Sequence, residues 1–592
     1  MIALFAFGLA IALQQPQEPY FQQGVDYRIE ARLNDSTGVL SGRARVLYTN
    51  HSRSTLDTLY FHMHLNAFRP NSAWARRDLE FNNRRFTDLG PDEHAYERLG
   101  RVTIDGRAIE PVFPGAPDST VVAFPLPRPL QPGQSATVFM DWEARASTLP
   151  RRQGRRGRHH DFAQWYPRIA VFDRGGWQVQ PLLPQGEFYG EFATYDVTLD
   201  VAADQVIGAT GVPIEGDPGW ARAAATGTQQ PLMRRHAYSP KPLEPLGFVQ
   251  GSVAPGRKRV RWYAENVHHF AWSTSPDYIY EGGQHDGIAI HVLYQPGDTA
   301  WDNGVAVQRT AKALEFLDSI FGPYPYPQVT NVHRIESGGT EFPMMVMNGS
   351  ASQGLIVHEV GHIYLHGIVA NNEWREGWLD EGFISFIGGL FDEAEGVPEA
   401  EIWDRQMQLM AQLESANLTQ PIGLKSSEFR DFNTYNLMTY TKPSLVFRML
   451  RDVVGDDAMR RALRDYYQRN KFRHVTESDV KEAFERASGQ DLDWFFQQWI
   501  QSAGKLDYAV GSARTRRLPN GQWETTVEVR RTGDNFMPVT LQVGSATRRL
   551  ESREPVQTVT VQTADRPTEV VLDPRNIIID VNPRNNRAAV SS

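Results

Sequence analysis

Cysteine is absent from the whole chain of 592 residues. Without a thiol, the protein can have no disulfide bond, no cysteine-based zinc ribbon, no thiol nucleophile and no lipid anchor attached to cysteine. Any metal site must therefore use histidine and carboxylate ligands. If the protein is exported, its stability does not depend on an oxidising compartment.

An excess of basic residues is also lacking. The chain has 61 Lys and Arg against 70 Asp and Glu, which gives a formal net charge of −9. A general nucleic-acid binder should carry a basic excess, so no nucleic-acid partner is expected. The strongest basic run, RRQGRRGRHH at 151–160, contains two glycines and no aromatic residue. It is predicted to be a solvated loop, with binding of an acidic ligand as the alternative.

Long apolar runs are missing as well. The chain begins MIALFAFGLAIALQQPQ, with an apolar run that is too short for a membrane span, which needs about 20 residues. Ala10 and Ala12 form the small-residue pattern of a signal-cleavage site, although the basic residues that usually come first are missing. We predict a signal-like segment at 1–18, no other membrane span, and an exported protein that is periplasmic or extracellular.

The hydrophobic periodicity divides the rest of the chain into three parts. From about 25 to 250, apolar and polar residues alternate between Gly, Pro and Asn breaks, which predicts a large antiparallel β domain. After about 300 the period becomes 3.6, which predicts amphipathic helices, and short strands return from 506. The expected fold is multidomain α+β: a β domain at 19–250, a mostly helical domain at 251–505 and a small β-sandwich at 506–592.

A metal-binding pattern lies in the helical part. In His358-Glu-Val-Gly-His362 the two imidazoles are four residues apart, so on a helix they share one face and can bind one ion. Glu359 lies beside the same face, where it can act as a general base in the HExxH arrangement. A catalytic zinc takes three protein ligands, and Glu381, which 18 intervening residues separate from His362, is a candidate for the third on a second predicted helix.

These blocks resemble a known family. HEVGH, eighteen residues and then WLDEGF are similar to the gluzincin zinc aminopeptidases, the family of aminopeptidase N and leukotriene hydrolase. The segment 338–343, GGTEFP, resembles the family's G-x-M-E-N exopeptidase block, and Tyr440-Thr-Lys442 resembles its Y-x-K-G block. Similar segments cover most of residues 25–505. The resemblance implies a thermolysin-like catalytic domain and a bacterial subgroup in which a strand-rich tail replaces the long helical C-terminal domain.

The resemblance implies one Zn²⁺ per chain, held by His358, His362 and Glu381. Glu359 would take the proton of the attacking water and pass it to the leaving amine, while Tyr440 would donate a hydrogen bond to the oxyanion.

For substrate binding, the resemblance implies that Glu341 holds the free α-ammonium of a peptide, which makes the enzyme an aminopeptidase. Gly338 and Gly339 would let the backbone approach the peptide closely. Thr340 and Phe342 replace the family's usual Met and Asn, which weakens the transfer of its substrate preference.

Other polar residues near these motifs receive weaker assignments. Asp380, Glu373 and Asn372 are candidates for orienting the zinc ligands. His366 continues the helical stripe but is interpreted as a packing or pocket-wall residue, because zinc already has its ligands. His268 and His269 are interpreted as structural.

Two other functions stay open at this stage. One is a zinc endopeptidase or other amide hydrolase in which Glu341 binds no amine. Thermolysin-like enzymes often have E-x-x-x-D after the motif, but Ser385 stands at that position here. The other is a non-catalytic peptide-binding scaffold, against which the intact site residues argue. The favoured function is a zinc aminopeptidase acting on peptides.

Overall fold

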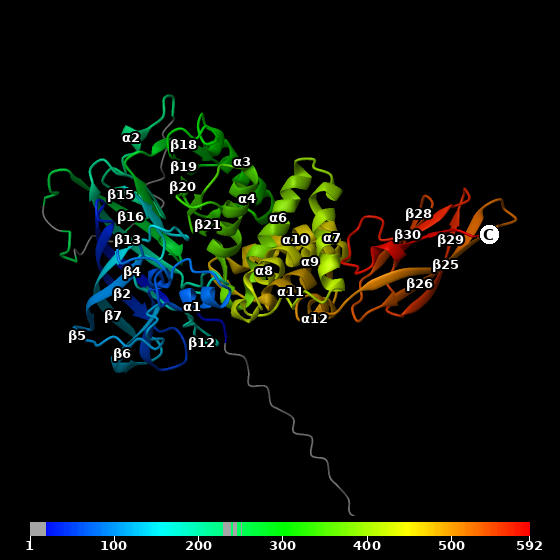
Figure 1. Ribbon diagram of the computed structural model, residues 1–592, viewed down its shortest axis with the longest axis horizontal. Coiled ribbons are helices and arrows are strands. Elements are labelled where there is room, and N and C mark those ends of the chain that lie inside the picture. The colour runs from blue at the N-terminus through cyan, green and yellow to red at the C-terminus, as the bar shows by residue number, and fades with distance from the viewer. Residues whose placement is uncertain (1–18, 229–237, 239, 241–245, 250–251, 592) are drawn as a thin grey trace, which may run out of the picture.

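The computed structural model describes residues 19–228, 238, 240, 246–249 and 252–591. The predicted signal-like segment at 1–18 lies outside the described residues. Three regions follow one another along an elongated molecule (Figure 1): a β region, a helical region in the middle and a second, smaller β region that contains the C-terminus. Among the described residues, no helix combines the length and the apolar content needed to cross a membrane. The α+β fold class expected from the sequence is confirmed.

The N-terminal region is built on an eight-stranded sheet of order β15-β16-β13-β1-β2-β7-β4-β5. Alternate residues of β2 are buried, as the period of two predicted. Most neighbours in the sheet are antiparallel, but β1 and β13 are parallel. The sheet continues past residue 250, the expected boundary, because β16 pairs with β13.

The elements of this region are β1 (Gly24–Asn34), β2 (Val39–Thr49), β3 (Leu56–His62), α1 (Ala73–Glu80), β4 (Tyr96–Ile104), β5 (Arg107–Ala108), β6 (Val121–Leu130), β7 (Ser135–Arg145), β8 (Gly154–Arg156), β9 (His159–Phe162), β10 (Arg168–Ile169), β11 (Phe172–Asp173), β12 (Gly176–Trp177), β13 (Ala193–Ala202), β14 (Val206–Ala209), β15 (Val212–Glu215), α2 (Trp220–Ala223), β16 (Arg257–Val267) and β17 (Trp272–Ser275).

The helical region begins with a five-stranded sheet of order β18-β19-β20-β22-β21. Its elements are β18 (Ile279–His285), β19 (Ile288–Tyr294), α3 (Val305–Phe321), β20 (Gln328–His333), β21 (Gly339–Phe342), β22 (Met345–Asn348), α4 (Gln353–His362), β23 (Val369–Asn371), α5 (Glu373–Glu376), α6 (Glu381–Ala394), α7 (Glu399–Ser415), α8 (Phe432–Asn436), α9 (Lys442–Val454), α10 (Asp456–Asn470), β24 (Arg473–Val475), α11 (Glu477–Ser488) and α12 (Asp493–Trp499). Within this sheet β21 is an edge strand, and among the described residues its only strand partner is β22, so the backbone groups of its other edge can pair with an extended chain.

The C-terminal region consists of a three-stranded sheet, β25-β26-β29, and a four-stranded sheet, β28-β27-β30-β31. Its strands are β25 (Asp507–Arg517), β26 (Trp523–Thr532), β27 (Val539–Val543), β28 (Ala546–Leu550), β29 (Val556–Thr563), β30 (Glu569–Leu572) and β31 (Arg587–Ala589). A buried guanidinium from the helical region, Arg448, donates to the carbonyl oxygen of Asn576 at 2.7 Å. The tail is therefore joined to the helices by polar contacts as well as by the chain.

Helices α4 and α6 approach closely at Gly361, and this contact brings Glu381 to the two histidines. A Cβ at Gly361 would lie 2.1 Å from Cδ1 of the buried Ile384 on α6. We expect Gly361→Val to lower the free energy of unfolding by about 1–3 kcal/mol, because the added methyl groups overpack this contact. Thermal unfolding with and without zinc measures the change.

Gly388→Ala is the matched control, because a Cβ at Gly388 on α6 would meet nothing within 4 Å. Alanine is the better helix former by about 1 kcal/mol, so this variant should be as stable as the parent or more so. Equal stability of the two variants would contradict the close approach of α4 and α6.

Candidate metal centre and active site

Three ligand atoms converge where α4 meets α6. Nε2 of His358 lies 3.0 Å from Nε2 of His362, and Oε2 of Glu381 lies 3.3 Å and 3.2 Å from these nitrogens. Ligands bound at about 2.1 Å in a tetrahedral site are separated by roughly 3.4 Å. His362 and Glu381 are buried, and Oε2 of Glu381 has no hydrogen-bond partner among the described residues. The structure thus brings together the three predicted ligands, and this donor set fits Zn²⁺.

A carboxylate behind His362 fixes the orientation of its ring. Nδ1 of His362 lies 2.5 Å from Oδ1 of the fully buried Asp380. This contact directs the other ring nitrogen, Nε2, toward the metal position, as second carboxylates do in zinc proteins. Burial raises the pKa of Glu381, but the two nearby imidazoles outweigh burial and hold that pKa well below its usual range. The ligand carboxyl is therefore ionised and ready to bind a cation.

The other candidates for orienting the ligands lie farther from the metal position. Nδ1 of His366 is 2.7 Å from Oε1 of Glu373 and 4.0 Å from Oδ2 of Asp380, and a carboxylate oxygen of Glu373 also lies within 4.8 Å of those of Glu341 and Glu187. Asn372 instead caps α5, where its side chain accepts a hydrogen bond from the amide of Trp374 at 3.2 Å. His268 is buried against His366, and its Nε2 lies 3.1 Å from the carbonyl oxygen of that residue.

Glu359 lies between the metal centre and the edge strand β21. Its side chain is buried and its Oε2 has no hydrogen-bond partner among the described residues. A Cβ at Gly339 would lie 2.0 Å from Oε1 of Glu359, so glycine is needed for this close approach. Burial raises the pKa of the Glu359 carboxyl to about 7, against the opposing effect of His358. A divalent cation beside it would lower that pKa and favour the base form.

Tyr440 reaches the centre from a π-helical turn, η6 (Leu437–Thr441), between α8 and α9. Such turns are rare and occur often at functional sites. Its hydroxyl donates to Oε1 of Glu381, and its ring lies parallel to that of His358 with centroids 6.5 Å apart. The phenol is therefore beside the metal position, where it can donate to an oxygen that gains negative charge.

Removing this hydroxyl tests the role of Tyr440. Tyr440→Phe should lower kcat by about a hundredfold with little change in KM, because one donor to the oxyanion is lost. Steady-state kinetics of the zinc-loaded protein measure both constants. Tyr435→Phe, which removes a hydroxyl from another residue that lines the same cavity, provides the comparison. A fall in kcat of less than threefold for Tyr440→Phe would argue for a packing role.

Two charged residues that the sequence analysis missed lie beside Glu341. The buried Arg152 pairs closely with Glu187, and its Nη1 lies 3.9 Å from Oε2 of Glu341. Nη1 of Arg152 and Oε1 of Glu341 have no hydrogen-bond partner among the described residues. Around Glu341, two carboxylates thus face one guanidinium, so this part of the cleft keeps a net negative charge. The clues in the sequence were the basic run and the GEFYG segment after Gln185.

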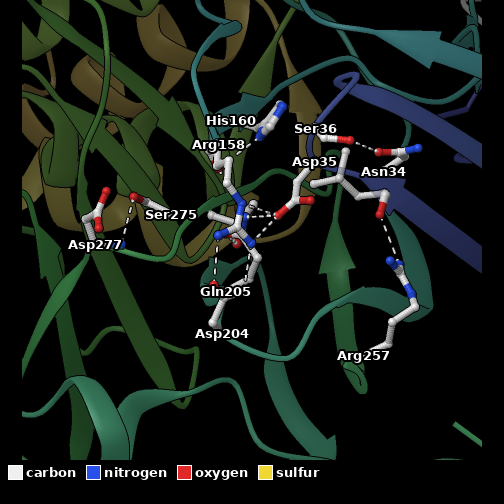
Figure 2. A network of polar contacts seen from close by, with 12 residues as sticks. Asn34, Asp35, Ser36, Arg158, His160, Asp204, Gln205, Arg257, Ser275 and Asp277 are labelled. Carbon is white, nitrogen blue, oxygen red and sulfur yellow. Dashed lines mark hydrogen bonds and ion pairs between the residues drawn. The ribbon is translucent and has the colours of Figure 1, made fainter. Parts of the chain in front are cut away.

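The basic run at 151–160 is not the solvated loop expected from its composition. Arg152 is buried and Arg151 has only 20% of its side chain exposed. Farther along the run, Arg158 donates hydrogen bonds to Asp35 and Asp204, two carboxylates from separate turns of the β region (Figure 2). The prediction was wrong because composition cannot reveal that acidic partners converge on the run from distant parts of the chain.

A cavity of about 500 Å³ joins these groups. Its lining includes every predicted site residue, together with three arginines and the missed glutamate: His358, Glu359, His362, Glu381, Tyr440, Glu341, Gly338, Gly339, Arg151, Arg152, Arg334 and Glu187. A larger cavity of about 1110 Å³ lies near β18 and the start of α3. Its carboxylate Glu281 already accepts from Tyr294 and from the amide of Gly304. The smaller cavity is therefore the candidate active site.

Known proteins are similar to parts of this chain. Residues 305–499 match the peptidase family M1 domain. Aminopeptidase 2, mitochondrial, of Saccharomyces cerevisiae is 24% identical over 241 residues, which are 37% of this chain and 25% of that protein. Aminopeptidase M1 of Arabidopsis thaliana is 24% identical over 305 residues, 46% of this chain and 33% of that protein. The chain thus aligns with about a quarter to a third of the length of these relatives.

Solved structures match a larger part of the chain. The M1 zinc metallopeptidase from Deinococcus radiodurans has a TM-score of 0.53 at 17% identity, covering 81% of this chain and 94% of that chain. Legionella pneumophila aminopeptidase A, in complex with aspartic acid, has a TM-score of 0.61 at 14% identity, covering 95% and 59%.

Fold and site together show a candidate metal centre of two histidines and one glutamate, in a fold similar to that of the M1 zinc metallopeptidase from Deinococcus radiodurans. More narrowly, residues 305–499 match the peptidase family M1 domain, and for this part of the chain the family resemblance seen in the sequence is confirmed.

Proposed function

We propose that this protein is a zinc-dependent aminopeptidase that removes N-terminal residues from peptides. The observation that carries the proposal is the arrangement of one cavity. A three-ligand metal site and a buried base occupy one part of its wall, and two buried carboxylates, Glu341 and Glu187, occupy another. The relatives named aminopeptidase support the same activity. An anionic pocket within reach of the base fits a substrate whose α-ammonium lies next to the bond to be cut.

Each residue has a defined part in this reaction. When bound, Zn²⁺ would polarise the scissile carbonyl and lower the pKa of the attacking water. Glu359 accepts the proton of that water and delivers it to the leaving amine. Tyr440 donates to the carbonyl oxygen as that oxygen gains charge. Glu341 and Glu187 bind the ammonium, and Arg152 holds the two carboxylates in place without cancelling their joint charge.

The test of this proposal is the pattern of cleavage. Zinc-loaded protein is incubated with a mixed peptide library, half with free and half with acetylated N-termini, and mass spectrometry identifies the cut positions. The proposal expects loss of single residues from free N-termini only. Internal cuts in both halves would identify an endopeptidase instead, and absence of cleavage would favour a binding scaffold.

Glu341→Gln tests the amine anchor itself. Losing the charge should raise KM for free-amine peptides by roughly tenfold to a hundredfold, because a charge-assisted hydrogen bond contributes about 1.5–3 kcal/mol. Kinetics on one peptide, with the zinc content measured in parallel, give the result. Glu315→Gln is the control, since Glu315 is an exposed carboxylate of α3. An unchanged KM for Glu341→Gln would remove Glu341 from this role.

We also propose that the protein is exported, to a periplasm or outside the cell. The proposal rests on the apolar N-terminal segment with its Ala10-x-Ala12 pattern. N-terminal sequencing of the protein recovered after expression tests it. A mature chain that begins soon after the pattern is expected, and an intact Met1 in a cytoplasmic fraction would contradict it.

A further inference from the structure

Arg151, the first arginine of the basic run, lies at the junction of two cavities. Besides the active-site cavity, a second cavity of about 460 Å³ lies against α1 and the start of α8. The two linings share Arg151, Ser337, Gly338 and Phe432. A chain that leaves the active site past these residues therefore enters the second cavity, and it passes Arg151 on the way.

The edge strand β21 sets the direction of the substrate. A peptide bound along the open edge, with its ammonium at Glu341, runs back along the chain toward Gly339, Gly338 and Ser337. Gly339 lies directly against the base Glu359, so the bond is cut near that point. Ser337 and Gly338, which also line the second cavity, therefore lie beside the part of the peptide that follows the scissile bond. The second cavity therefore receives the part of the peptide that leaves.

Arg151 has weak partners at this junction. Its Nη1 lies 3.7 Å from Oε1 of Glu336, beyond hydrogen-bond length, and its guanidinium stacks over Trp74 at 5.7 Å from the ring centroid. Within the described part of the chain its side chain donates no hydrogen bond. Glu336 is shared, because its Oε2 accepts from the amide of Arg152 at 2.6 Å and lies 3.7 Å from Arg334.

Arginines and carboxylates face one another at the junction. Arg85, Arg151 and Arg334 face Asp78 and Glu336. A third carboxylate of the second cavity, Asp431, caps α8 and pairs with Arg430 at 3.4 Å. Burial, followed by the nearby Arg152, lowers the pKa of Arg151 to about 10, which keeps it charged at neutral pH. A substrate carboxylate could pair with Arg151, because Glu336 lies beyond hydrogen-bond length from its guanidinium.

We propose that Arg151 binds a carboxylate of the substrate beyond the scissile bond, so that the preferred substrates are short peptides whose C-terminal carboxylate reaches this point. An extended chain covers about 3.3 Å per residue, so a tripeptide anchored at Glu341 extends past the cut toward Ser337. The same contact could be made by an acidic side chain at the third position. The inference rests on the proposed aminopeptidase activity, which supplies the direction of the peptide.

The experiment compares three peptides that differ in their carboxylates: Ala-Ala-Ala with a free C-terminus, Ala-Ala-Ala amide, and Ala-Ala-Asp amide. With zinc-loaded protein, kcat/KM for the free acid should exceed that for the amide by about tenfold. Arg151→Met should reduce this ratio to less than twofold, and Arg151→Lys should keep part of it. Arg156→Met, an exposed arginine of the same run, should leave the ratio unchanged. Each ratio is taken within one variant, so a change in folding does not produce it.

The third peptide and a binding measurement complete the test. If kcat/KM for Ala-Ala-Asp amide equals that for the free acid, Arg151 binds a carboxylate from either source. If it equals that for Ala-Ala-Ala amide, Arg151 binds only the C-terminal carboxylate. Calorimetric titration of the peptides into Glu359→Gln separates the two proposals. If no peptide is cut by the parent enzyme, the proposed function fails, while tighter binding of the acid would still support the Arg151 site. Equal kcat/KM for the free acid and the amide in the parent protein would overturn the inference. An unchanged acid-to-amide ratio in Arg151→Met would overturn it as well.

Discussion

Glu359→Gln should lower turnover at least about a thousandfold while the protein keeps its zinc. Glutamine has nearly the same shape but cannot accept a proton, and general bases typically contribute 10²- to 10⁴-fold to a rate. The metal should remain because the ligand atoms belong to His358, His362 and Glu381, which the substitution leaves in place. Steady-state kinetics on a free-amine peptide, together with elemental analysis of the purified protein, measure both quantities.

Glu359→Asp separates charge from position and is the informative control. It keeps the carboxylate but shortens the side chain by one methylene, so activity should fall between the parent and Glu359→Gln. Gly339 makes this sensitivity plausible, because the base already lies against the backbone of β21. Activity of Glu359→Gln within tenfold of the parent, at full zinc content, would mean that another group accepts the proton.

The meeting of the three candidate metal ligands could be predicted because the information is local. His358 and His362 need only one helical turn, and Glu381 needs only a second helix that returns beside the first. The three-part division of the chain was equally visible, because the hydrophobic period changes from two to 3.6 and back. The structure adds the cause of the close helix contact, which is the absence of a side chain at Gly361.

The cluster of Glu341, Arg152 and Glu187 in the cleft could not be predicted in the same way. Glu187 and Arg152 come from loops of the N-terminal region, and Glu341 comes from an edge strand of another sheet. Their meeting depends on how the β region packs on the helical region, for which no short pattern exists. The basic run shows the difficulty well. Its sequence suggested solvent exposure, but Arg152 and Arg158 pair with acids that are distant along the chain, as Figure 2 illustrates for Arg158.

The π-helical turns are a second feature that the hydrophobic periodicity of the sequence could not predict. The HExxH helix continues into one such turn, η3 (Ile363–Ile368), and Tyr440 lies in another, η6. In each case one extra residue per turn shifts the following side chains around the axis. The shift places His366 against Glu373, and the Tyr440 hydroxyl against Glu381. Pattern matching located Tyr440, but only the turn explains how it reaches the metal position.

Glu381→Gln should cause the largest loss of metal binding. Replacing the only anionic ligand leaves two neutral imidazoles and a weak amide oxygen, whereas removing a group that merely supports a ligand already costs 10- to 100-fold in metal affinity. We therefore expect zinc to bind more than about a hundredfold more weakly, with turnover lost in parallel. Competition with a chelator of known affinity measures the first effect, and kinetics at fixed free zinc measure the second.

Thermal unfolding gives an independent reading of the same change. A ligand that binds only the folded state raises stability by RT ln(1 + [L]/Kd), so the parent should melt at higher temperature as free zinc rises. Glu381→Gln should need at least a hundredfold more zinc for the same shift. Asp392→Asn is the matched control, since it removes a carboxylate from an exposed position of the same helix and should respond as the parent does. If Glu381→Gln kept one tightly bound zinc per chain, Glu381 would not be the third ligand, and another of the buried carboxylates near His362 would have to take its place.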